Sequence, residues 1–164
     1  MQYAGLIKND IAAAPGLCVT FFTQGCPHKC PGCHNPETWD FEGGKEFTPN
    51  IINEIIDALN AQGIKRTFCI MGGEPLCSEN EFLTLLIITE IKKHCPDTPI
   101  YVWSGYTLEK LLAKGERVKQ ILREIDFLVD GPYIKELHTS TTPMIGSSNQ
   151  QIIDMKKIDF SKKI

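Results

Sequence analysis

The sequence has little of what membrane, secreted or nucleic-acid-binding proteins carry. Its apolar runs are short and interrupted, and the first residues, MQYAGLIKNDI, lack both the basic start and the apolar middle of a signal peptide. Basic residues number 17 against 20 acidic ones, which gives a net charge of -3, and there is no long basic run. We therefore expect a cytoplasmic protein whose partners include no membrane and no nucleic acid.

The chain also lacks internal repeats and any stretch that reads as a linker between domains. With 164 residues, of which 42% are hydrophobic, it can bury one substantial core. These features predict a single domain over residues 1–164.

Cysteine, in contrast, is present in an odd number, and three of the seven lie within eight residues. They are Cys26, Cys30 and Cys33, spaced C-x-x-x-C-x-x-C, with glycine and proline between them that disfavour helix and strand. In a cytoplasmic chain, clustered cysteines favour a metal site over a disulfide framework. The three thiolates can turn toward one point.

Two kinds of metal centre agree with these thiolates. Soft thiolate ligands bind zinc, cuprous copper or iron–sulfur clusters, and both a structural zinc ion and an ordinary cubane cluster need four protein ligands. For zinc, His28 and His34 are the nearby candidates for the fourth ligand. The other possibility is a 4Fe-4S cluster with three irons bound by the cysteines and the fourth iron open.

Apolar periodicity predicts strands that alternate with helices, hence an α/β fold with a mostly parallel sheet. The strands are expected over residues 17–23, 65–71, 99–103, 126–132 and 151–154. The helices are expected to begin at Thr48, at a Ser78–Glu81 capping box, at Thr107 and near Val118. Residues 1–15 are expected to be an irregular or short-strand lead-in, residues 133–150 a flexible loop, and residues 156–164 an exposed tail.

The remaining cysteines give weaker signals. Cys18 and Cys69 fall on predicted strands and are expected to be small buried side chains. Cys77 and Cys95 have no visible role.

A second motif, Gly72-Gly73-Glu74-Pro75, follows the predicted strand 65–71. Ligands of parallel α/β sheets bind where strands end, and two glycines let a ligand approach the backbone closely. The alternative is a simple turn, because glycine and proline occur in turns everywhere. Ser104 and Asp130 end the next two strands and fall on the same expected rim, although aspartate also forms turns.

The cysteine spacing followed by GGEP resembles the radical S-adenosylmethionine (SAM) enzymes. More narrowly, the segments CPHKCPGCHNPETW, GGEPL, VWSGYT, DFLVDGPYI and GSSNQ, in this order, resemble the activating enzymes of the anaerobic (class III) ribonucleoside-triphosphate reductases. The resemblance covers nearly the whole sequence. It departs at Ile145 and Gln151, where that family commonly has arginine.

The resemblance implies a site and a fold. A 4Fe-4S cluster on Cys26, Cys30 and Cys33 would bind the amino and carboxylate groups of SAM at its fourth iron. The methionyl amino group of SAM would lie on Gly72, Gly73, Glu74 and Pro75, with Ser104 and Asp130 as further cofactor-binding candidates. The implied fold is a shortened, open (βα) partial barrel, because eight βα units need about 200 residues or more.

The resemblance also implies a reaction. One electron from the reduced cluster would cleave SAM to methionine and a 5′-deoxyadenosyl radical, which takes a hydrogen atom from a glycine loop of the reductase's large subunit. An electron donor such as a flavodoxin would reduce the cluster. No acid–base pair or nucleophile is required, in keeping with the absence of a recognisable catalytic triad.

Two other functions stay open on the residues alone. One is a different small radical SAM enzyme that acts on a metabolite. The other is a zinc-stabilised binding module, which would leave the GGEP motif unexplained.

Overall fold

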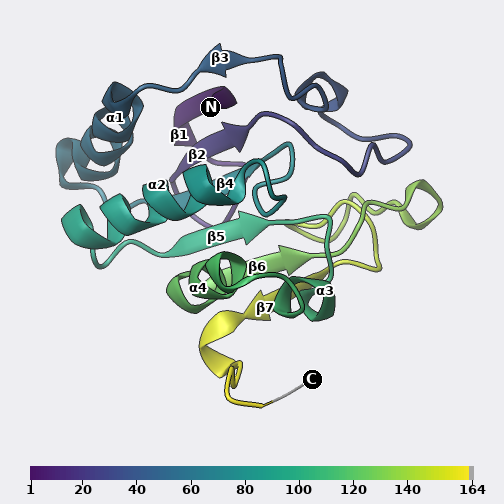
Figure 1. Ribbon diagram of the computed structural model, residues 1–164. Helices are drawn as coiled ribbons and strands as arrows, with labels where there is room; N and C mark the ends of the chain where they lie inside the picture. Colours follow the sequence, from purple (N-terminus) through teal and green to yellow (C-terminus); the bar gives the residue numbers. More distant parts are fainter. Residues whose placement is uncertain (163–164) are drawn as a thin grey trace.

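Short strands alternate with helices along the chain, and the strands join into one sheet (Figure 1). The structure is a computed structural model that describes residues 1–162. Within these residues, the sheet has seven strands in the order β3-β1-β2-β4-β5-β6-β7. The strands are β1 (Gln2–Asp10), β2 (Cys18–Thr23), β3 (Lys45–Glu46), β4 (Thr67–Gly72), β5 (Ile100–Trp103), β6 (Phe127–Asp130) and β7 (Gln151–Asp154). The α-helices are α1 (Pro49–Asn60), α2 (Glu81–His94), α3 (Leu108–Leu112) and α4 (Glu116–Glu124).

Parallel pairing occupies the centre of the sheet. β2 pairs with β4, β4 with β5 and β5 with β6 in parallel. β1, β3 and β7 join at the two edges in antiparallel pairs. Parallel neighbours need a crossover, which α1, α2 and the α3–α4 pair supply in turn. The predicted α/β class and its mostly parallel sheet are therefore confirmed.

β1 is the main departure from the expected elements. It is a strand of nine residues, where the sequence predicted an irregular or short-strand lead-in. Its antiparallel register with β2 shifts between Tyr3 and Gly5 and again between Ile7 and Asp10. Each shift alters which side chains share a face of the sheet, so the alternation that identifies a strand is lost.

The helices begin close to the predicted residues, with one different cap. Thr48 precedes α1, which has Pro49 in its first turn, and the Thr107 hydroxyl caps α3 by accepting a hydrogen bond from the Lys110 amide. The Ser78–Glu81 capping box does not form, because the Ser78 hydroxyl donates to Glu79 and α2 begins after Asn80. Of the helices within residues 1–162, none is long and apolar enough to cross a membrane.

The two faces of the sheet differ because side chains alternate along each strand. Phe21 and Phe68 belong to the main core, together with buried residues of α1, α2 and α4. Of these helices, α2 and α4 are seen in front of the sheet in Figure 1. Cys18 and Cys69 pack in a smaller cluster, with Trp103 beside it. Both cysteines are fully buried, as predicted.

Cys77 and Cys95 are buried as well. Burial raises the pKa of the Cys77 thiol to about 12 and also raises the pKa of Cys95. Both side chains therefore stay protonated near neutral pH and behave as small apolar groups.

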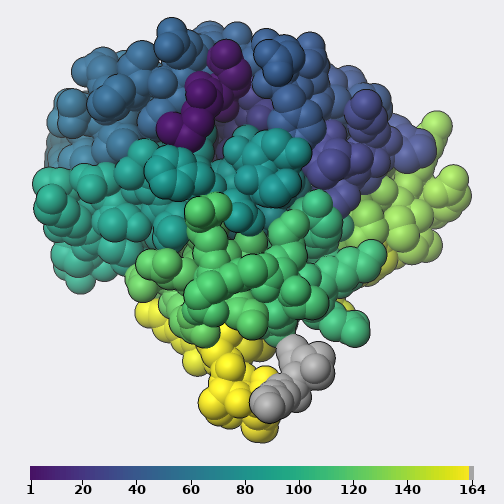
Figure 2. Space-filling model, viewed as in Figure 1, coloured from purple at the N-terminus to yellow at the C-terminus, as the bar shows by residue number. Residues whose placement is uncertain are grey.

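The segment after β7 is less exposed than the sequence predicted for residues 156–164. Ile158 and Phe160 pack against the main core, and the guanidinium carbon of Arg123 lies 5.5 Å from the centre of the Phe160 ring. In Figure 2 this yellow segment lies against the green surface of the preceding helices. Residues 163 and 164, the last of the predicted tail, lie outside the described residues.

The packing of the core predicts how a truncated core side chain changes the free energy of unfolding. Phe68→Ala should lower the free energy of unfolding by about 3–5 kcal/mol, because it leaves a cavity at a fully buried position of a central strand. Phe82→Ala is the matched control, because Phe82 is 51% exposed and its loss should cost no more than about 0.5 kcal/mol. Urea unfolding under anaerobic conditions measures both variants. Equal losses would contradict the assignment of the core.

Candidate functional site

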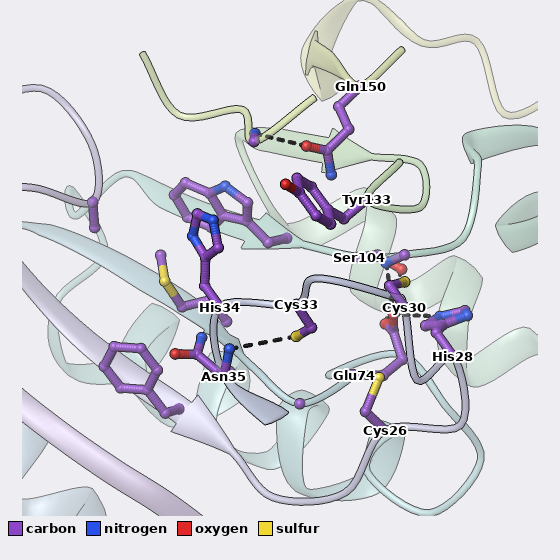
Figure 3. Close-up of a pocket in the computed structure, with 18 of the residues that line it drawn as sticks. Cys26, His28, Cys30, Cys33, His34, Asn35, Glu74, Ser104, Tyr133 and Gln150 are labelled. Atoms are coloured by element: carbon purple, nitrogen blue, oxygen red, sulfur yellow. Dashed lines mark hydrogen bonds and ion pairs between the residues drawn. The ribbon is translucent and has the colours of Figure 1, made fainter. Parts of the chain in front are cut away.

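The cysteine loop and the glycine-rich turn face the same cavity (Figure 3). The cavity measures about 550 Å³ and lies where β2, β4 and β5 end. Its wall also includes residues from the loop between β6 and β7. A volume of this size is typical of a site for a cofactor or small ligand. The expected rim of a parallel sheet is therefore where the cavity lies.

Backbone geometry holds the cysteine loop beside the sheet. The amides of Gly25 and Cys26 donate to the carbonyls of Thr38 and Trp39, which closes the loop at its base. Within it, the Cys33 amide donates to the Cys30 carbonyl, and a left-handed Lys29 (φ 48°) helps to turn the chain. Cys26, Cys30 and Cys33 are all partly exposed and all line the cavity. The structure thus brings the three predicted ligands to one site.

The three loop thiols do not converge on one point. Within residues 1–162, no three His, Cys, Asp or Glu side chains are gathered closely enough to hold one metal ion. In a cluster each thiolate binds a different iron, so its cysteines surround the cluster rather than one point. His28, a candidate fourth ligand for zinc, has its Nε2 engaged with Glu74 at 2.8 Å.

Burial changes the chemistry of the loop thiols. It raises the pKa of Cys26 and of Cys30 above the ordinary value for a thiol, although backbone hydrogen bonds partly oppose the effect. Both side chains are therefore protonated at neutral pH in the metal-free chain. A metal centre that takes thiolates must displace these protons when it binds.

The glycine-rich turn packs directly on the cysteine loop. The Gly73 amide donates to the Thr23 carbonyl and the Glu74 amide to the Gly25 carbonyl, both at 2.9 Å. A Cβ atom at position 73 would lie only 2.4 Å from the Gly25 carbonyl oxygen. From the sequence, the two glycines were expected to let a ligand approach the backbone closely. In the structure, the backbone of the cysteine loop is what approaches Gly73.

Not all of the motif reaches the cavity. Gly72, Gly73 and Glu74 line it, whereas Pro75 does not. The Pro75 carbonyl instead accepts a hydrogen bond from the Thr84 hydroxyl at 2.8 Å, which ties the turn to α2.

The Glu74 carboxylate is buried and accepts four hydrogen bonds. Its Oε1 accepts from the Leu76 amide at 3.0 Å and from the Ser104 hydroxyl at 2.8 Å. Its Oε2 accepts from His28 Nε2 at 2.8 Å and from the Gly105 amide at 2.7 Å. Because a carboxylate has about four acceptor sites, a ligand cation could contact this group only by displacing one of these donors.

Ser104 and Asp130, the two other residues predicted at the rim, differ in whether they line the cavity. Ser104 lines the cavity and donates to Glu74. Asp130 is buried at the end of β6 but does not line the cavity. Its Oδ2 accepts from the Leu108 amide at 2.7 Å and so fixes the start of α3.

Several wall residues were missed by sequence reasoning. Gln150 joins the last loop to the site, because its Oε1 accepts from the Gly146 amide and its Nε2 donates to the Gly131 carbonyl. Tyr133, from the same loop, lies near the cysteines in Figure 3. The order of the segments DGPYI and GSSNQ was the only signal for these residues, because the region has no periodicity.

One wall residue leaves a polar atom without a partner. The indole N–H of Trp39 is buried and has no hydrogen-bond partner among residues 1–162, although Trp39 lines the cavity. A buried donor without an acceptor is costly.

Comparison with known proteins agrees with this geometry. A family model described as a 4Fe-4S single cluster domain matches residues 12–153. The chain is 37% identical, over 153 residues, to the anaerobic ribonucleoside-triphosphate reductase-activating protein of Escherichia coli (strain K12), with 93% of this chain and 97% of that protein covered. The proteins of the same name from Vibrio cholerae and from enterobacteria phage T4 are 35% and 33% identical, each over 93% of this chain and 97% and 93% of their own lengths.

Proposed function

Because this chain belongs to the family of anaerobic ribonucleoside-triphosphate reductase-activating proteins, we propose that it is the enzyme that installs a glycyl radical on such a reductase. It is an activating oxidoreductase that uses a 4Fe-4S cluster and SAM. The observation that carries the proposal is that three clustered cysteines share one cavity with the Gly72–Glu74 turn, while the other four cysteines are buried elsewhere.

Cys26, Cys30 and Cys33 would hold the cluster. Three ligands leave one iron of a 4Fe-4S cluster open, and the cavity that the three cysteines line measures about 550 Å³, a size that suits a ligand such as SAM. When bound, the reduced cluster supplies the electron for reductive cleavage of SAM. This chain's own residues bind and orient SAM and keep water and other hydrogen donors away.

Some of the predicted residues would contact SAM directly, and others would act indirectly. The backbone of Gly72 and Gly73, which line the cavity, would supply carbonyl acceptors for the methionyl ammonium group of SAM. Pro75 and Asp130 would act indirectly, because each holds a neighbouring helix rather than the cavity wall.

Four parallel strands with helices on one face, and a cavity on the other, support a shortened, open (βα) partial barrel of the radical SAM type. We take residues 1–164 as a single domain of this kind, because one main core joins residues from β1 to the segment after β7.

The open side of the cavity would receive the glycine loop of the reductase's large subunit. Ile7 lines the cavity and is 45% exposed, and Ile11, in the adjoining loop, is 85% exposed. Exposed apolar side chains beside a cavity are typical of a contact surface. An electron donor such as a flavodoxin would reduce the cluster, and the reaction would take place in the cytoplasm.

Paramagnetic resonance tests this function. The protein is reconstituted anaerobically, reduced with dithionite and recorded with and without SAM, and it is then mixed with the cognate reductase. We expect a cluster signal that SAM perturbs, followed by a stable glycyl doublet on the reductase. SAM cleavage without a doublet would contradict the proposed target and favour a small-molecule substrate. A colourless protein that contains zinc would contradict the cluster itself.

A further inference from the structure

We propose that His28 and Glu74 form a latch that fixes the cysteine loop against the Gly72–Pro75 turn and the end of β5. In this role Glu74 is a positioning residue that acts through His28, rather than a direct ligand of SAM. The inference rests on the proposed function, because it explains how the cluster is held facing the site where SAM would bind.

The donors to Glu74 come from three separate segments. Leu76 belongs to the turn itself, Ser104 and Gly105 follow β5, and His28 lies in the cysteine loop. Gly105 lies 31 residues after Glu74 in the sequence, and His28 lies 46 residues before it. The carboxylate is therefore the point at which the cysteine loop, the turn and β5 are joined. An exposed ligand-binding carboxylate would not need this set of partners.

His28 is placed where it can control the loop. It lies two residues after Cys26 and two before Cys30, so holding its ring holds the backbone between two cysteines. Its ring lies edge-on to Tyr106 with the centres 4.4 Å apart. A Cβ atom at Gly105 would lie 2.5 Å from the His28 ring, so only glycine leaves room for it there.

The His28–Glu74 pair is largely buried, so loss of its hydrogen bond should be costly. The Glu74 side chain is 1% exposed and the His28 side chain 18% exposed. Hydrogen bonds to a buried carboxylate are strong, and removal of one donor leaves the acceptor unsatisfied. Asn80, also buried, adds a second tie, because its Nδ2 donates to the carbonyls of both Gly25 and Glu74. Loss of His28 should thus free the middle of the loop while its base stays anchored.

The experiment compares three variants of the full-length protein. His28→Ala removes the donor. His28→Gln keeps an N–H group close to the position of Nε2 and should restore the contact. His94→Gln is the matched control, because His94 also pairs with a glutamate, Glu90 at 3.4 Å, but on an exposed face of α2.

The first readout needs neither cluster nor SAM. Lys29 is exposed in the middle of the loop and is followed by Cys30, so trypsin can cut there. Cleavage follows the fraction of time that the loop is open. We expect anaerobic, metal-free His28→Ala to be nicked after Lys29 about tenfold faster than the unaltered protein. His28→Gln should be close to the unaltered protein, and His94→Gln should equal it.

The second readout is SAM binding by the reconstituted proteins. His28→Ala should keep its iron content, because all three thiols remain, but should bind SAM about tenfold more weakly. SAM should perturb its cluster signal less, and His28→Gln should recover most of both effects.

Two results would overturn the latch. One is equal nicking of His28→Ala and the unaltered protein. The other is faster nicking with no change in SAM affinity, since the loop would then be held for stability alone. Failure of the unaltered protein to take up a cluster or bind SAM is a separate result, and it would overturn the proposed function.

Discussion

Replacement of Cys30 by alanine is expected to abolish both the iron–sulfur cluster and SAM cleavage. Cys30 is one of three thiols on the cavity wall, and the other four cysteines are buried where they cannot replace it. Two remaining thiolates cannot hold three irons. Iron analysis and the visible absorption of the anaerobically reconstituted protein measure the first loss, and the release of methionine from SAM measures the second.

Cys95→Ala is the control for this experiment. Cys95 is a buried free cysteine at the end of α2, and its Sγ accepts a hydrogen bond from Asn60 rather than facing the cavity. Its removal should cost about 1 kcal/mol of stability and leave iron content and SAM cleavage intact. A full complement of iron in Cys30→Ala would show that the ligand set is wrong.

Gly73→Ala is expected to have the second largest effect. The new methyl group would lie 2.4 Å from the Gly25 carbonyl oxygen, which is backbone and cannot move aside as a flexible side chain can. Overpacking of this severity costs about 3 kcal/mol, which corresponds to about a hundredfold weaker SAM binding if the whole cost falls on the site. Equilibrium binding of SAM to the reconstituted variant measures the effect.

Gly115→Ala provides the comparison. A Cβ atom at Gly115 would meet no other heavy atom within 4 Å, and the residue lies before α4, away from the cavity wall. Its SAM affinity should equal that of the unaltered protein. If Gly73→Ala bound SAM as tightly as Gly115→Ala, the close packing of turn and loop would be irrelevant to the site.

The central strands and the meeting of the two motifs could be predicted from the sequence. β2, β4, β5 and β6 coincide with runs of apolar and β-branched residues, and such runs favour buried parallel strands. Once the strands are parallel, their ends share one edge of the sheet. The Cys26–Cys33 loop and the Gly72–Glu74 turn therefore had to lie near each other, as the structure confirms.

What could not be predicted depends on contacts between distant residues. The sequence indicates a carboxylate at Glu74, but the four donors that occupy it include His28 and Gly105, which no local pattern relates to it. Asp130 ends a strand as a ligand-binding residue would, yet its partner is the first turn of α3. At the end of a strand, a polar side chain can serve a ligand or the next helix, and the chemistry of the residue alone does not distinguish the two.

The burial of four cysteines makes thiol counting a gauge of cofactor loading. A thiol-reactive dye in solution meets only the partly exposed Cys26, Cys30 and Cys33, because the others are sealed in the core with 0–7% of their surface exposed. With the cluster held as proposed, the native chain should present three reactive groups when metal-free and almost none when loaded with iron, while the denatured chain should present seven. The missing fraction of the three would then give the cluster occupancy of each preparation without an activity assay.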